Sequence, residues 1–163
     1  ARDLLAQAPQ RAACLALLAG LLAPGGRLVL AERAPRLGER LLAALDWSGA
    51  PPELARRAIA AEEAVYADAA NPTLDWDEKT LERECVAAGL RTLHKEVLRH
   101  PLEFVLGPAL LRRWFGAESA RPGGLAARLG EEAPAVRAFL ERVAVGRPVR
   151  RQTAVVLLVA ERP

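Results

Sequence analysis

Residues 21–32, LLAPGGRLVLAE, decide the fold, because a helix end, a turn and a strand follow one another in this one stretch. Pro24 cannot continue a helix, and Gly25 and Gly26 can adopt the positive φ angles that reverse a chain. Residues 28–31 are apolar at every position, a pattern typical of a strand that is covered on both faces. The stretch therefore predicts a strand in the interior of an α/β sheet.

Helices are expected on both sides of this strand. Residues 9–22 carry apolar side chains at helical spacing and lead into the turn. Downstream, the spacing predicts a short helix over 37–46 and a longer one over 52–69. Asp77 is a good N-cap for a further helix, and Gly89 is suited to end that helix in the left-handed conformation.

Two later segments are predicted to be strands. In residues 90–99, LRTLHKEVLR, Lys95 interrupts the apolar face, which favours an edge strand. Residues 153–160, TAVVLLVA, are rich in valine and apolar throughout, which favours a central strand. The sequence between these strands is expected to form a helical insertion, at about 101–151, with helices over 108–115, 124–129 and 134–145 and a mobile loop over 117–124.

Composition is that of a globular chain of one domain or half-domain. The chain has 163 residues, of which 52% are hydrophobic and 26% are charged. Its longest apolar runs are shorter than the roughly 20 residues that a membrane helix requires. Cys14 and Cys85 fall in predicted helices, and no charged-then-apolar leader opens the sequence, so we expect reduced thiols and a cytoplasmic location.

Positive charge is concentrated in the second part of the chain. The formal net charge is +3, and residues 91–163 hold 13 of the 23 Lys and Arg but only 7 of the 20 Asp and Glu. Nearly all of the cations are arginines, since Lys79 and Lys95 are the only lysines. Arginine binds phosphate groups through a planar fork of donors, so an anionic partner is one reading of this bias.

The segments LAPGGRLVL (22–30) and DEKTLERECVAAGL (77–90), in this order, resemble the second half of a class I S-adenosylmethionine-dependent methyltransferase. The resemblance implies a partial Rossmann-like sheet in which these strands are the fifth, sixth and seventh, in the order 5-7-6. It implies that the last strand, residues 153–160, runs antiparallel between the other two. It covers most of the chain apart from the insertion at 101–151.

The resemblance also implies where the cofactor would bind. Methyltransferases of this class hold S-adenosylmethionine through a glycine-rich loop after the first strand and an acidic residue after the second. No GxGxG motif occurs in this sequence. We therefore expect no cofactor-binding residue in this chain, and we expect the cofactor half to lie in preceding sequence of the same polypeptide. The activity implied is methyl transfer helped mainly by positioning, and it is not expected from this segment alone.

A second resemblance concerns the segments ERAPRLGERL (32–41), AEEAVYADAANPTLDWDEKTL (61–81) and LLRRWFG (110–116). They are similar to a methyltransferase-like extension fused behind AAA+ ATPases of DNA replication and recombination. This similarity implies an ATP-binding module upstream, because no Walker GxxxxGK motif is present here. It offers a different function, a non-catalytic domain that contacts partner proteins or nucleic acid.

Candidate contact residues follow from these two readings. Glu32 and Arg33 stand at the carboxyl end of the first strand, where α/β sheets place their ligands, so they are candidates for substrate contact. The alternative is a solvated strand end. His94 and His100 lack the neighbouring carboxylates or thiols of a metal site, so we predict no metal ligand. We also predict no catalytic residue.

Basic residues beside an aromatic ring form the second group of candidates. Arg112 and Arg113 precede Trp114, and arginines next to aromatic rings can grip phosphates and stack on bases. At helical spacing, however, Trp114 is also suited to pack in a core. The remaining candidates for contact with DNA or RNA precede the last strand: Arg147, Arg150 and Arg151.

The strand of residues 28–30 is expected to leave an apolar sheet edge open. Natural sheets cover such edges, so we expect it to pair with upstream sequence or with a second copy of the chain. No membrane partner is expected. These readings leave two functions open, the acceptor-side half of a methyltransferase and a non-catalytic interaction domain, and fold similarity alone does not choose between them.

Overall fold

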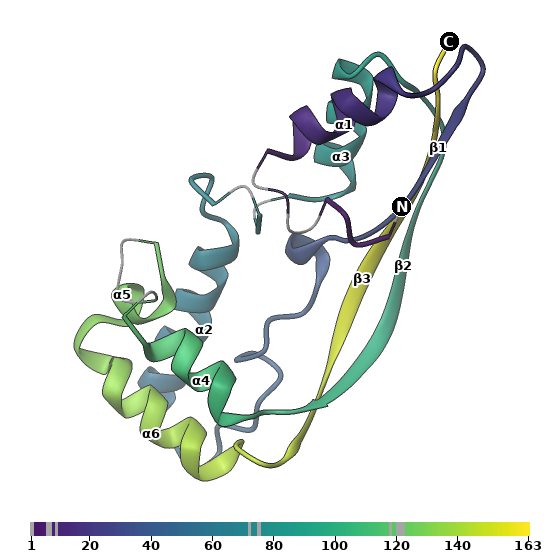
Figure 1. The fold of residues 1–163 in the computed structure, drawn as a ribbon. Helices are drawn as coiled ribbons and strands as arrows, with labels where there is room; N and C mark the ends of the chain where they lie inside the picture. The colour runs from purple at the N-terminus through teal and green to yellow at the C-terminus, as the bar shows by residue number, and fades with distance from the viewer. Residues whose placement is uncertain are drawn as a thin grey trace. The chain divides into compact units, whose positions relative to one another are not determined.

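The computed structural model describes residues 2–5, 8, 10–71, 73–74, 76–117, 119 and 123–163. Within these residues the fold is α/β, with three strands and a larger number of helices (Figure 1). The elements are α1 (Arg11–Gly20), β1 (Arg27–Arg33), the 3-10 turn η1 (Pro35–Leu37), α2 (Pro52–Tyr66), α3 (Glu78–Ala87), β2 (Arg91–Val105), α4 (Pro108–Phe115), α5 (Leu125–Leu129), η2 (Gly130–Glu132), α6 (Ala133–Val143) and β3 (Pro148–Glu161). In the described ranges, no helix combines the length and apolarity needed to cross a membrane.

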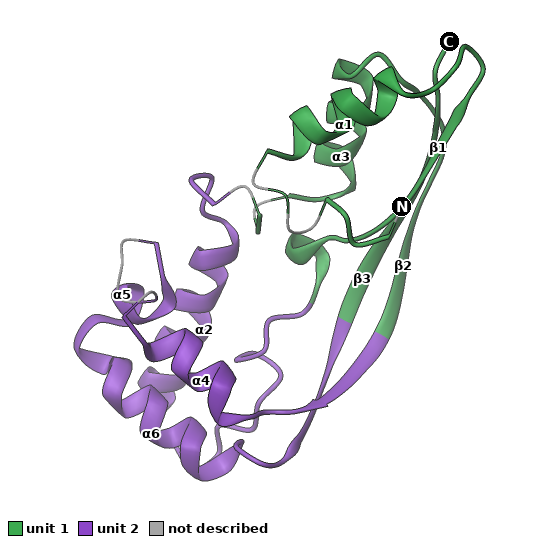
Figure 2. Cartoon of the chain, viewed as in Figure 1, with its two compact units in different colours: residues 1–38, 72–100, 153–163 green, residues 39–71, 101–152 purple. Residues whose placement is uncertain are grey.

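The chain divides into two compact units (Figure 2). The first unit contains residues 1–38, 72–100 and 153–163, and the second contains residues 39–71 and 101–152. Strands β2 and β3 each contribute residues to both units. Each unit has its own hydrophobic cluster, so each is described separately.

The first unit contains the sheet that the sequence predicts. Its strand order is β1-β3-β2, with β3 antiparallel to β1 and Leu30 opposite Leu158 in the register. The last strand therefore lies in the centre, and β2, the strand carrying Lys95, lies at the edge. Both placements confirm the expectations from the sequence, because a valine-rich run suits a position flanked by two strands.

Only one face of this sheet is covered within the first unit, which corrects the expectation of burial on both faces of β1. Leu30 is fully buried against α1 and α3, whereas its neighbour Val29 is 49% exposed. In β3 the residues facing the helices, such as Val156 and Leu158, are buried, and the alternate residues are half-buried. The unbroken apolar run of β3 accompanies its central place in the sheet, whereas β1 lies at an end of the described sheet and has one buried face.

The turn between α1 and β1 forms as its sequence predicts. Gly25 adopts a φ of +73°, which favours glycine. Its amide donates to the carbonyl oxygen of Arg162 at 2.8 Å, and the amide of Arg162 donates to the carbonyl oxygen of Gly26 at 2.9 Å. These two bonds tie the turn to the end of β3 and help to set the register of the two strands.

Helix α3 has the boundaries expected from its sequence. The Asp77 carboxylate accepts a hydrogen bond from the Thr80 amide at 2.8 Å, which is N-cap geometry. Gly89 adopts a φ of +80°, and the following amide, of Leu90, donates to the carbonyl of Cys85 at 3.0 Å. Cys85 lies on the buried face of this helix and, like Cys14 in α1, is a free thiol.

Strand β2 is longer than predicted, since it continues through Pro101 to Val105. The prediction of a strand ending near Arg99 was therefore too short, and the helical part of the insertion begins after Leu106. Proline has no backbone N–H and cannot donate a hydrogen bond to a neighbouring strand. An edge strand such as β2 tolerates a proline, because only one of its sides pairs with another strand of the sheet. Strand β3 likewise begins before Thr153, at Pro148, so Arg150 and Arg151 lie within it.

The second unit packs α2, α4, α5 and α6 around a common core. Fully or nearly buried side chains from all four helices meet in it, among them Ala58, Leu111, Leu129 and Leu140. The predicted helices 52–69, 108–115, 124–129 and 134–145 are confirmed to within a few residues. Part of the predicted loop 117–124 lies outside the described residues.

The predicted helix over 37–46 was wrong. The chain instead forms the 3-10 turn η1 and then a short turn in which the Ala44 amide donates to the carbonyl of Arg40. The amides of Leu41 and Leu42 donate to the buried carboxylate of Glu62, at 3.0 and 2.7 Å. This tertiary contact provides hydrogen-bond acceptors for the amides at the start of the turn. The turn does not extend into a helix.

Candidate functional site

Glu32 lies at the end of β1 but is completely buried. Its two carboxylate oxygens accept hydrogen bonds from the amides of Leu4 and Leu5, each at 3.0 Å. Asp3, the residue before them, has a φ of +49°, which is uncommon outside glycine but tolerated by aspartate. Glu32 therefore anchors the start of the chain onto β1 and is not a solvated strand end.

Arg33, the other candidate at this end of β1, lies on the opposite face of the strand. Its side chain is 57% exposed, and its Nε donates to Oδ1 of Asp3 at 3.0 Å. Exposed pairs of this kind contribute little to stability. Glu32 and Arg33 thus both contact the first residues of the chain, and whether either one contacts a substrate stays a prediction.

The candidates of α4 separate by face. Trp114 packs against the core of the second unit, together with Leu110 and Phe115, while Arg112 and Arg113 are exposed. The reading of Trp114 as a core residue is therefore the one that this packing supports. Arg112 and Arg113 remain candidates for contact with an anionic partner.

The candidates around the start of β3 also differ in their surroundings. Arg151 is half-buried, its guanidinium lies 5.8 Å from the centre of the Phe104 ring, and it donates to the carbonyl of Glu39 at 3.2 Å. Arg147 and Arg150 are exposed. Within the described ranges, neither of these two arginines forms an ion pair. Arg151 thus has contacts within its own unit, and Arg147 and Arg150 face solvent.

Arg147 and Arg150 line a pocket of about 520 Å³ in the second unit. One side of the pocket is the turn of residues 46–49, and the other is formed by the end of α6 and the start of β3. The lining residues are Ala44, Leu45, Asp46, Ser48, Gly49, Val143, Ala144, Arg147, Pro148, Val149 and Arg150. We call this the 46–150 pocket.

Asp46 supplies the negative charge of the 46–150 pocket. Its Oδ1 accepts a hydrogen bond from the Ser48 amide at 2.9 Å. This bond, and a second one to the Ser48 side chain, lower the pKa of the Asp46 carboxyl below its ordinary value. The carboxylate is therefore ionised at neutral pH and can accept a hydrogen bond from a ligand.

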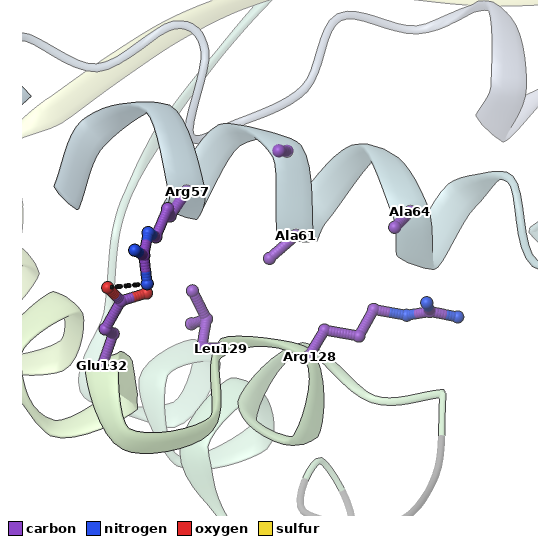
Figure 3. Close-up of a pocket in the computed structure, with 7 residues that line it drawn as sticks. Arg57, Ala61, Ala64, Arg128, Leu129 and Glu132 are labelled. Atoms are coloured by element: carbon purple, nitrogen blue, oxygen red, sulfur yellow. Dashed lines mark hydrogen bonds and ion pairs between the residues drawn. The ribbon is translucent and has the colours of Figure 1, made fainter. Parts of the chain in front are cut away.

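A second pocket, of about 510 Å³, lies between α2 and the segment 128–132 (Figure 3). Ala60, Ala61 and Ala64 of α2 line one wall. Both of its arginines are paired: Arg57 with Glu132 at 2.7 Å, as Figure 3 shows, and Arg128 with Asp68. Because these carboxylates neutralise the arginines, this pocket is a poorer anion site than the 46–150 pocket.

No metal site is found among the residues that the structure describes. His94 lies 3.6 Å from Glu96, and both side chains are more than half exposed. Cys85 lies away from solvent, and burial raises the pKa of its thiol to about 11, with a smaller contribution from the nearby Glu84. A thiol with such a pKa is a poor nucleophile and a poor metal ligand at neutral pH.

The glycine pairs of this chain are not suited to hold S-adenosylmethionine. The amides of Gly25 and Gly26 donate to the carbonyls of Arg162 and Ala23, both at 2.8 Å, so neither points at a ligand. A Cβ on Gly124 would lie 2.2 Å from the carbonyl oxygen of Ser119, so this glycine is required by backbone packing. The Gly25-Gly26 pair therefore serves the turn into β1, and Gly124 serves local backbone packing.

Comparisons with known proteins add little to this picture. No protein-family model matches the chain, and no curated protein matches it. Among solved structures it is similar to a protein from Bacillus halodurans C-125 described as a putative methyltransferase, with 14% identity and a TM-score of 0.47. The similarity covers 99% of this chain and 62% of that one, so this chain spans less than two thirds of its length. A likeness at this level carries no argument about function.

Sequence reasoning identified Arg147 and Arg150 but missed the residues that complete their pocket. Asp46 and Ser48 are about 100 residues away in the sequence, and the stretch WSG (47–49) reads only as a turn. The one available signal is the Asp-x-Ser spacing, which is common in turns and carries no information about a ligand.

Proposed function

We propose that this chain is the C-terminal, acceptor-side half of an S-adenosylmethionine-dependent methyltransferase-like domain. The observation that supports this proposal is the sheet: β3 lies antiparallel between β1 and β2, in the order implied by the sequence resemblance. In that numbering β1, β3 and β2 would be strands five, seven and six. Fold and motif order support the proposal, since no catalytic constellation is found among the residues that the structure describes.

The outer edge of β1 supports a further part of the proposal. Arg2 forms a parallel bridge to Ala31, and the Asp3 amide donates to the carbonyl of Ala31 at 3.0 Å. A strand leading into Arg2 would run parallel to β1 and would extend this pairing along its outer edge toward Arg27. Upstream sequence is therefore the occupant we favour, in preference to a second copy of the chain.

The edge proposal is tested by light scattering and amide exchange. In the longest natural polypeptide that carries this sequence, the amides of Arg27 and Val29, which point away from β3, should be protected while the protein is monomeric. A concentration-dependent dimer with the same protection would favour a second copy instead. A monomer in which these amides exchange rapidly would contradict both occupants.

The cofactor proposal is tested by calorimetric titration of S-adenosylmethionine into the same polypeptide. Because the glycine turns of this chain do not fit the cofactor, the residues that hold it would lie in the other half of the domain. We expect micromolar binding to that polypeptide and none to residues 1–163 alone. Absence of binding in the folded polypeptide would refute the catalytic proposal and would favour a scaffold retained for contact.

A second candidate function is contact with nucleic acid, as an extension of a AAA+ ATPase of DNA metabolism. It is favoured by one observation, the exposure of Arg112, Arg113, Arg147 and Arg150 in the second unit. Nucleic-acid affinity of this kind weakens steeply as salt rises. Substitution of these four arginines by alanine should abolish salt-dependent DNA binding, and an unchanged affinity would remove this candidate.

A further inference from the structure

The 46–150 pocket is bounded by a turn that aromatic packing holds in place. Trp47 stacks on Phe139 of α6, with ring centres 4.6 Å apart and planes within 7° of parallel. The indole N–H of Trp47 donates to the carbonyl of Leu42 at 2.7 Å. Both contacts restrain the residues on either side of Trp47, which are Asp46 and Ser48. The polar wall of the pocket is thus largely preformed, and little ordering entropy is lost when a ligand enters.

The charge of this pocket is positive. Arg147 and Arg150 line it without an ion-pair partner in the described ranges, and Asp46 is its one acidic lining residue. The carbonyl end of α6 also faces the pocket at Val143 and Ala144, but the partial charge of a helix end is about half a unit. Two full positive charges outweigh one carboxylate and this half charge, so the pocket favours an anion.

The other lining residues restrict which anions fit the pocket. Ala44, Leu45, Val143, Pro148 and Val149 supply an apolar surface, which an inorganic ion would leave unused. The Asp46 carboxylate repels an anionic group and instead accepts hydrogen bonds from hydroxyl or amino groups. A volume of about 520 Å³ falls in the range of small-molecule sites, which is roughly 300–1,000 Å³. The lining therefore favours a molecule that combines an anionic group with hydroxyl or amino donors and an apolar part.

We propose that the 46–150 pocket binds one nucleotide unit, with Arg147 and Arg150 on its phosphate and Asp46 accepting from a hydroxyl or amino group of its nucleoside part. The forked guanidinium groups match phosphate oxygens in geometry as well as in charge. The unit is either a free nucleotide or one residue of a nucleic acid. This site is independent of the methyltransferase proposal, and only its nucleic-acid form rests on the second candidate function.

The test uses the longest natural polypeptide that carries this sequence, titrated with adenosine 5′-monophosphate, adenosine, inorganic phosphate and a ten-nucleotide single-stranded DNA. We expect the monophosphate to bind at least tenfold more tightly than adenosine. Arg147→Gln combined with Arg150→Gln should weaken its binding at least tenfold, because charge-assisted bonds to phosphate are lost. Both side chains are exposed, so these changes should leave the fold intact, and the paired Lys variants should restore part of the affinity.

Asp46→Asn separates the nucleoside contact from the phosphate contact. The substitution removes a negative charge but preserves shape, so it should leave inorganic phosphate binding equal or tighter. It should also lower the ratio of monophosphate affinity to phosphate affinity at least threefold. Arg112→Gln combined with Arg113→Gln is the matched control, since these arginines lie on α4 and do not line the pocket. This control should not change monophosphate binding.

Each outcome decides the proposal. If the monophosphate binds through Arg147 and Arg150 and the DNA does not bind, the ligand of the pocket is a free nucleotide. If the DNA binds and the variant with both Arg147→Gln and Arg150→Gln loses this binding, the ligand is a residue of a nucleic acid. DNA binding that depends only on Arg112 and Arg113 would overturn the nucleic-acid form of the site while the second candidate function stands. No monophosphate binding, or binding unchanged in the Arg147 and Arg150 variant, would overturn the proposal as a whole.

Discussion

Replacement of Glu32 by glutamine separates a structural role from a substrate contact at the end of β1. The wild-type carboxylate is fully buried and accepts from two backbone amides, at 3.0 Å each. A glutamine retains one acceptor oxygen, but its NH₂ group faces the other amide and cannot accept from it. The buried amide of Leu5 and the partly buried amide of Leu4 therefore compete for one neutral oxygen.

The expected loss follows from these contacts. A hydrogen bond to a charged group contributes about 1.5–3 kcal/mol, and a buried amide left without a partner costs about 1–3 kcal/mol. Because a weaker neutral bond remains, we expect Glu32→Gln to lower the free energy of unfolding by about 2–4 kcal/mol. For a chain of this size each kcal/mol lowers the midpoint of thermal unfolding by roughly 2–4 °C.

Urea unfolding followed by circular dichroism measures this loss. Glu131→Gln is the matched control, because Glu131 is an exposed glutamate in η2, and its replacement should change stability by less than about 0.5 kcal/mol. If Glu32→Gln unfolded at the wild-type urea concentration while substrate or nucleic-acid binding fell, the anchoring role would be refuted. Glu32 would then act at a binding site.

Three further predictions concern groups whose surroundings the structure defines. Burial raises the pKa of the Glu62 carboxyl above its ordinary value. In the pH window between these two pKa values the folded protein holds a proton that the unfolded chain has released, so the free energy of unfolding should fall as pH rises through this window. Glu62→Gln should remove this pH dependence, as urea unfolding at several pH values can measure. Asp77→Ala removes the α3 N-cap and should cost about 1 kcal/mol, whereas Asp77→Asn should retain most of it; equal losses in urea unfolding would contradict the cap. At pH 8, iodoacetamide should modify the half-buried Cys14 well before Cys85, as peptide mass spectrometry can follow, and similar rates would contradict the burial of Cys85.

Much of the fold could be predicted because it is encoded locally. The turn at Gly25, the cap at Asp77 and the end of α3 at Gly89 each depend on residues within a few positions of one another. The valine-rich run of β3 likewise predicts its central place. Such features are readable from spacing, because the conformational preferences of proline, glycine and β-branched residues act on their immediate neighbours.

The errors arose where distant groups compete with local preference. The spacing of residues 37–46 favours a helix, but the amides of Leu41 and Leu42 bind a carboxylate about twenty residues downstream. Pro101 reads as the end of a strand, yet the edge position of β2 lets that strand continue. Local patterns contain no information about either partner.

The sequence by itself determined the α/β class, the position of most helices and strands, and the excess of arginine in the second part of the chain. Only the tertiary structure decided which charged groups are buried, as Glu32 and Glu62 are, and which arginines share a pocket. The physical reason is that burial and charge depend on three-dimensional neighbours. Asp46 lines the same pocket as Arg147 and Arg150, about 100 residues away in the sequence, and the packing of Trp47 on Phe139 holds its turn in place.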